Sequence, residues 1–92
     1  MPERSVNVTI DEAEIKDGES SYLRVKISSE DGEPVFLSFV RGTSPQQISD
    51  VLYEIARYFE DDEEAKLLLS EENRQNIIDL FTEASHNVPG LG

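Results

Sequence analysis

The sequence predicts an α+β fold in which a three-stranded antiparallel meander is followed by two main helices packed on one face of the sheet (β-β-β-α-α), and it allows a short helix between the two. Apolar and polar side chains alternate with a period of two in the first half, which is typical of strands. Two Asp-Gly pairs interrupt this alternation where hairpins need turns. After residue 44 the apolar side chains recur every three or four positions, as on a half-buried helix.

Three strands are expected, each with one apolar side. The apolar positions in chain order are Val6, Val8, Ile10, Leu23, Val25, Ile27, Val35, Leu37 and Phe39. Strand register must place apolar residues opposite apolar ones, because a slip of one residue turns every side chain to the other face. In the first hairpin, a two-residue loop at Asp17-Gly18 meets this condition by pairing Ile10 with Val25.

The second hairpin requires a longer loop. A two-residue turn would set Glu30 against Glu33, whereas a three-residue loop pairs Val25 with Leu37. The longer loop calls for Gly32 in the left-handed region, which glycine adopts at little cost. The second strand is therefore expected at the centre of the sheet.

The first helix is expected to begin at Ser44. Ser44 can cap it, Pro45 suits its first turn and Gln47 can complete a capping box. The apolar face that follows consists of Ile48, Val51, Leu52, Ile55, Ala56 and Phe59.

The last helix is expected to begin at Ser70, where Glu71 and Glu72 suit the positive end of the helix dipole. Its apolar face is Ile77, Ile78, Leu80, Phe81 and Ala84.

Leu67, Leu68 and Leu69 are expected to form a turn of helix packed under the core. We expect one domain over residues 1–92, frayed at 1–4 and 87–92, with a buried centre made of Val25, Leu37, Leu52, Ile55, Phe59, Ile77 and Phe81.

Composition argues against catalysis. The chain has no Cys and a single His, His86, without a partner at metal-binding spacing. It contains neither a nucleophile-elbow pattern nor a glycine-rich phosphate loop. We therefore expect no enzyme, no catalytic residue, no metal and no cofactor. The sequence also has no apolar run of about 18 residues and no signal-peptide pattern, so a cytoplasmic protein is expected.

Charge is the most distinctive property of the chain, with 20 acidic and 8 basic residues and a net charge of −12. The acids are densest in the acidic run, Glu60, Asp61, Asp62, Glu63 and Glu64. Such a chain repels nucleic acid and anionic lipid, so direct binding to either is not expected. The acidic run is open to three interpretations: a solvated helix junction with Asp61 or Asp62 as a cap, a docking surface for a Lys/Arg-rich partner, or a weak divalent-ion site.

A second candidate surface lies on the other side of the sheet. The expected register gathers Tyr22, Arg24, Lys26, Phe36 and Val40 there, which we call the sheet-face patch. Long side-chain stems can cover such a patch, or it can form a weak homodimer or partner contact.

The layout resembles a family of small phage anti-CRISPR proteins that inhibit Cas9. The resemblance rests on a meander followed by helices, on strong acidity, and on the stretches Ser29–Glu33 and Phe59–Glu64. The helix that precedes the sheet in that family has no counterpart here. In that family such acids substitute for DNA in a basic pocket. The resemblance implies partner-binding roles for Asp31, Gly32, Glu33, Asp61, Asp62, Glu63 and Glu64.

The expected function is that of a non-catalytic acidic binding protein that inhibits or modulates a nucleic-acid-binding protein, encoded by a phage or mobile element. Its expected partner-binding residues are Asp31, Glu33, Glu60, Asp61, Asp62, Glu63 and Glu64. The alternative is a housekeeping adaptor or small subunit from a high-salt or high-GC host. That alternative would use the sheet-face patch for protein contact, and its acidity would serve solubility.

Overall fold

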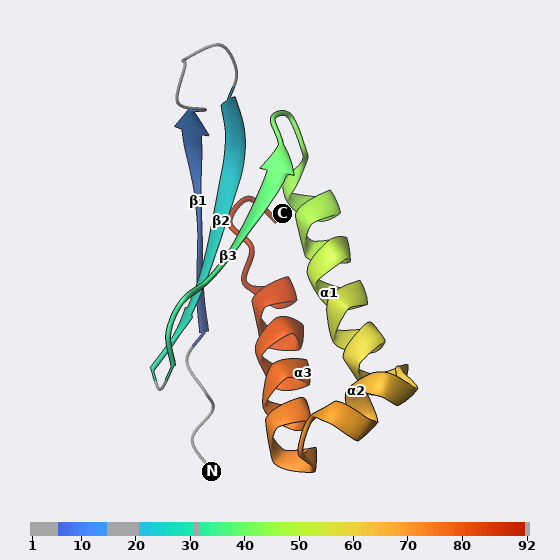
Figure 1. The fold of residues 1–92 in the computed structure, drawn as a ribbon. Helices are drawn as coiled ribbons and strands as arrows, with labels where there is room; N and C mark the ends of the chain where they lie inside the picture. Colours follow the sequence, from blue (N-terminus) through green and yellow to red (C-terminus); the bar gives the residue numbers. More distant parts are fainter. Residues whose placement is uncertain (1–5, 15–20, 31, 92) are drawn as a thin grey trace.

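The computed structural model describes residues 6–14, 21–30 and 32–91, and it has two layers (Figure 1). The three-stranded sheet forms one layer, and the helices cover one of its faces. The elements are β1 (Val6–Glu14), β2 (Ser21–Ser29), β3 (Val35–Val40), α1 (Pro45–Asp61), α2 (Glu63–Leu68) and α3 (Glu71–His86). The predicted fold class is confirmed, including the short helix between the two main ones. No helix among the described residues is long and apolar enough to cross a membrane.

The sheet has the order β1-β2-β3 with antiparallel neighbours, so β2 is central as predicted. Ile10 pairs with Val25, and Val25 pairs with Leu37, which confirms both predicted registers. The Asp17-Gly18 turn and residues 1–4 lie outside the described residues. The left-handed conformation predicted for Gly32 is wrong, because the described glycines with positive φ are Gly42 and Gly90. The register of the second hairpin therefore does not require it.

The start of α1 follows the predicted capping box. The backbone N–H of Gln47 donates to Ser44 Oγ at 3.2 Å, and the backbone N–H of Ser44 donates to Gln47 Oε1 at 3.0 Å. At α3, Ser70 caps in the same way, since its Oγ accepts from the backbone N–H of Asn73 at 3.1 Å. Both helix starts are therefore fixed by local sequence.

The core lies between the apolar face of the sheet and the inner faces of α1 and α3. Its largest fully buried side chains are Val25, Ile27, Ile48 and Leu52. Of the expected centre, Val25, Leu52 and Phe81 are buried, whereas Leu37, Ile55, Phe59 and Ile77 are partly buried and pack around it. The expected helix faces are therefore confirmed except at Val51, which is exposed, and the fully buried centre is shared between β2 and α1.

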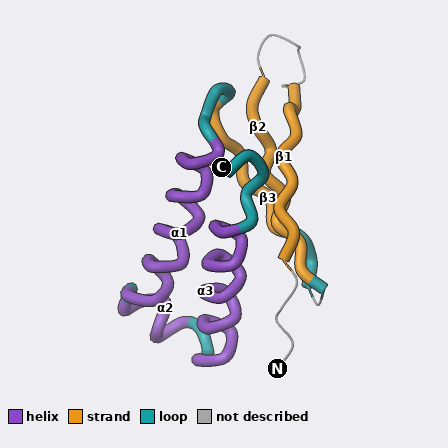
Figure 2. The backbone as a smooth tube through the Cα atoms, turned by 180° about the vertical axis from the view of Figure 1, so that it is seen from behind, coloured by secondary structure: helices purple, strands orange, loops and turns teal. Residues whose placement is uncertain are grey.

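The segment after α3 differs from the expected frayed end. Val88 is buried within the core, and Leu91 packs against it. The side-chain amide of Asn87 donates from Nδ2 to the carbonyl oxygen of Val6 at 2.8 Å. Figure 2 shows this segment running from the end of α3 alongside the sheet. The apolar side chains of Val88 and Leu91 dock it, whereas residue 92 lies outside the described residues.

The leucines of α2 also differ from expectation. Leu67 is 83% exposed and Leu68 78% exposed, so neither packs under the core. Ala65 is the buried residue of this helix. A six-residue helix can turn only one narrow side inward, and here a small residue occupies that side.

Candidate functional site

The helical layer, α1 to α3, carries most of the charge. Residues 45–92 hold 11 acidic and 3 basic side chains. Each of these bases is engaged locally: Arg57 lies 2.9 Å from Glu60, Lys66 lies 3.3 Å from Glu63, and Arg74 lies 3.0 Å from Glu71. The other carboxylates of this layer have no ion-pair partner among the described residues. The layer therefore presents a strong, uncompensated negative field.

Two rows of exposed carboxylates run along the helical layer, and we call them the outer rows. They are Asp50, Glu54 and Asp61 on α1, and Glu72, Asp79 and Glu83 on α3. At 100° per residue, each row lies on the side of its helix opposite the buried residues. At 1.5 Å per residue, each row extends for about 16 Å.

The helices α1 and α3 pack side by side, so one helical layer carries both outer rows (Figures 1 and 2). Ser49 Oγ on α1 donates to the carbonyl oxygen of Ser85 on α3 at 2.6 Å. Ala56 and Ala84, both fully buried, permit close packing of the layer. The rows are consequently carried by rigid elements.

The acidic run forms the corner between α1 and α2. Asp62 ends α1 and caps α2, where its Oδ2 accepts from the backbone N–H of Ala65 at 2.9 Å. Glu60 and Glu63 form the ion pairs described above, whereas the side chains of Asp61 and Glu64 have no hydrogen bond or ion pair within the described residues. The helix-junction interpretation is confirmed, with Asp62 as the cap. Docking at Asp61 and Glu64 stays a prediction.

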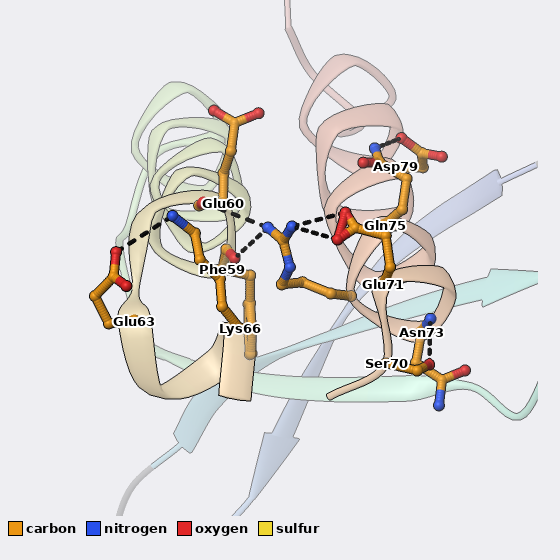
Figure 3. A network of polar contacts seen from close by, with 10 residues as sticks. Phe59, Glu60, Glu63, Lys66, Ser70, Glu71, Asn73, Gln75 and Asp79 are labelled. Atoms are coloured by element: carbon orange, nitrogen blue, oxygen red, sulfur yellow. Dashed lines mark hydrogen bonds and ion pairs between the residues drawn. The ribbon is translucent and has the colours of Figure 1, made fainter. Parts of the chain in front are cut away.

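Arg74 holds this corner in place from α3. Its Nη1 donates to the carbonyl oxygens of Phe59 at 3.3 Å and Glu60 at 3.4 Å, in the last turn of α1. Its Nη2 donates to both carboxylate oxygens of Glu71, at 3.1 and 3.0 Å. Figure 3 shows these contacts converging between the two helices. The Arg74 side chain is only 12% exposed. Its positive charge lies at the C-terminal end of α1, where the helix dipole favours a cation.

The role of Arg74 was not predicted from the sequence. Its spacing of three from Glu71 could have predicted the ion pair, since such residues are neighbours on a helix. The contact of Arg74 with α1 depends on the chain reversal between α1 and α3, and no local sequence pattern encodes this reversal.

The structure does not join Glu33 to the acidic run. Glu33 is exposed in the loop between β2 and β3. That loop and α2 lie at the same end of the molecule, with α3 between them (Figure 1). Asp31 lies outside the described residues. One contact surface for both segments would have to extend around α3.

The sheet-face patch is brought together as its residues predicted. Tyr22 pairs with Val40, and Lys26 pairs with Phe36. The Arg24 guanidinium lies 5.9 Å from the centroid of the Phe36 ring and 3.8 Å from the Asp11 carboxylate. Phe36 is 55% exposed and Val40 79% exposed. The patch is therefore apolar and weakly basic, unlike the helical layer.

Comparisons with protein-family models, with curated proteins and with solved structures give no match. Within the described part of the chain, no group of three or more His, Cys, Asp or Glu side chains could hold a metal ion. His86, the single histidine, is exposed at the end of α3.

Proposed function

We propose that this protein is a non-catalytic acidic binding protein that occupies the nucleic-acid-binding surface of a basic partner. The observation that carries the proposal is the pair of outer rows on one rigid helical layer. The resemblance to Cas9-inhibiting anti-CRISPR proteins makes a basic DNA-binding channel the partner surface we propose first.

The charge spacing supports competition with DNA. Duplex DNA carries one charge per about 1.7 Å of its axis, or about 3.4 Å along each strand. Each outer row places three carboxylates along about 16 Å. This density is lower than that of DNA but still gives several contacts to a groove lined by Lys and Arg. Substitution of the phosphates can therefore be partial, and base sequence is not imitated.

The one-sided charge distribution supports the same proposal. The sheet-face patch carries Arg24 and Lys26, whereas the outer rows are wholly acidic. A field of this asymmetry orients the molecule as it approaches a basic partner and speeds association.

Affinity capture tests the proposal. The immobilised protein is exposed to lysate of its source organism, and bound proteins are eluted with duplex DNA or with NaCl. We expect nucleic-acid-binding proteins that duplex DNA displaces. Neutralising one outer row with Asp50→Asn, Glu54→Gln and Asp61→Asn should abolish their capture.

The matched control removes three charges from β1, with Asp11→Asn, Glu12→Gln and Glu14→Gln. It should retain most of the captured protein. Equal loss in both triple variants would show that only total charge matters, and a captured protein that duplex DNA leaves bound would contradict competition.

One observation favours a second candidate function, that of an adaptor. Phe36 and Val40 are large apolar residues exposed on the same sheet face. An adaptor that uses this face should lose its partner on Phe36→Ala and keep it in the outer-row variant. The same capture experiment therefore separates the two functions.

A further inference from the structure

The corner between α1 and α2 contains an open hollow of about 350 Å³. Tyr58 and Phe59 line it from α1, Leu68 lines it from α2, and Leu69 lines it from the position just after α2. The Tyr58 and Phe59 rings meet edge to face, with their centroids 5.5 Å apart. The walls are therefore mainly apolar and are carried by two different helices.

These walls are unusually exposed for apolar side chains. Tyr58 is 58% exposed and Leu68 78% exposed, and no segment of the described residues covers them. Covering an apolar side chain removes its surface from water, which is favourable in free energy. A partner that fills the hollow would gain part of this free energy.

The rim of the hollow is acidic. Asp62 and Glu64 line it together with the apolar residues. The Asp62 carboxylate already caps α2. The side chains of Glu64 and of Asp61, which precedes Asp62 in the sequence, have no hydrogen-bond or ion-pair partner among the described residues. Carboxylates around an apolar floor complement an apolar side chain that is flanked by Lys or Arg.

The size of the hollow limits its occupant. Sites for drug-sized molecules span about 300–1,000 Å³ and bury most of the ligand. This hollow is near the lower limit and is open to solvent, so it suits one or two side chains of a larger partner. The acidic rim disfavours a nucleic acid or an anionic lipid as that partner.

We infer that the hollow binds a basic amphipathic helix of the partner protein, with an apolar side chain of that helix inserted between Tyr58 and Leu68. The inference rests on the proposed function, since it assumes a basic partner, and it adds an apolar anchor beside the acidic layer. The charge of the acidic layer then speeds association, and the apolar anchor slows dissociation of the complex.

A designed peptide tests this inference. The probe has 14 residues, with one Trp and several Leu at helical spacing and Lys elsewhere. The reference peptide has one Trp and Lys at all other positions. The chain itself contains no Trp, so peptide emission reports burial of the anchor. We expect a blue shift and tighter binding for the amphipathic peptide.

The chain offers a matched pair of variants. Leu68→Ser removes a wall of the hollow, whereas Leu67→Ser alters a neighbouring residue of similar exposure outside it. We expect Leu68→Ser to weaken amphipathic-peptide binding about tenfold, or about 1.4 kcal/mol. Leu67→Ser should change it less than twofold. Glu64→Gln should weaken binding at low salt more than Glu83→Gln does.

The outcomes separate this inference from the proposed function. If both peptides bind equally and Leu68→Ser has no effect, the hollow is not a docking site, while electrostatic binding by the acidic layer still stands. If Leu67→Ser and Leu68→Ser weaken binding equally, the inserted position is wrong. If neither peptide binds at low salt, the layer has no affinity for basic segments, and both proposals fail.

Discussion

Replacing Arg74 with methionine should destabilise the fold while keeping most of the apolar stem of the side chain in place. The change removes two charge-assisted hydrogen bonds to the last turn of α1. It also removes a cation from the C-terminal end of this helix, where the helix dipole makes a positive charge favourable. Hydrogen bonds to charged groups contribute about 1.5–3 kcal/mol each, and these two are long. The ion pair with Glu71, whose side chain is 81% exposed, adds at most about 0.5 kcal/mol.

Together these losses predict a fall of about 2 kcal/mol in the free energy of unfolding. For a domain of this length, the melting midpoint should drop by about 8–16 °C. Urea unfolding followed by circular dichroism measures the free energy, and amide hydrogen exchange should show faster opening of α2. Glu71→Gln, which leaves the carbonyl contacts intact, should cost at most about 0.5 kcal/mol.

Lys66→Met is the control for charge, because it removes the same unit charge from an exposed ion pair in the same region. If it destabilises the fold as much as Arg74→Met does, the contacts with Phe59 and Glu60 contribute nothing. The explanation for the fixed corner would then be wrong.

Two further predictions concern stability. Added NaCl should raise the melting midpoint, because at about 0.15 M charges more than about 8 Å apart are largely screened; a flat or falling midpoint in thermal melts would contradict uncompensated repulsion in a chain of net charge −12. Gly42→Ala should cost about 1–2 kcal/mol, because its φ is 93° and a Cβ is unfavourable there. Gly32→Ala should stay within about 0.5 kcal/mol in the same urea assay, since its Cβ would meet only Ser29 Oγ at 3.4 Å; equal costs would contradict the assigned glycine conformations.

The sheet was predictable because its side chains restrict each other. Shifting the first hairpin by one residue would oppose Ile10 with a polar residue, and shortening the second loop would oppose Glu30 with Glu33. The helix starts were equally accessible, since Ser44 and Ser70 act on atoms three residues away. Local chemistry determined these features, and sequence alone could therefore reveal them.

The remaining features depend on distant contacts. Arg74 binds carbonyl groups 14 and 15 residues away. Leu68 is a large apolar residue of the kind found in cores, yet the short helix turns Ala65 inward instead. Gly32 was assigned a left-handed conformation from loop length alone, whereas the described glycines with positive φ are Gly42 and Gly90. The acidic site was visible as composition, whereas its division into paired and unpaired carboxylates required the structure.

The docked segment after α3 has a consequence for synthesis of the chain. The bond from Asn87 to Val6 joins residues 81 positions apart, and Val88 completes a core that begins on β1. The two hairpins are local and can form early, but their apolar face stays uncovered until α3 and Val88 have left the ribosome. At about 5–20 residues per second, that interval lasts seconds. During this interval the negative charge of the chain reduces aggregation, because like-charged nascent sheets repel one another before their cores are closed.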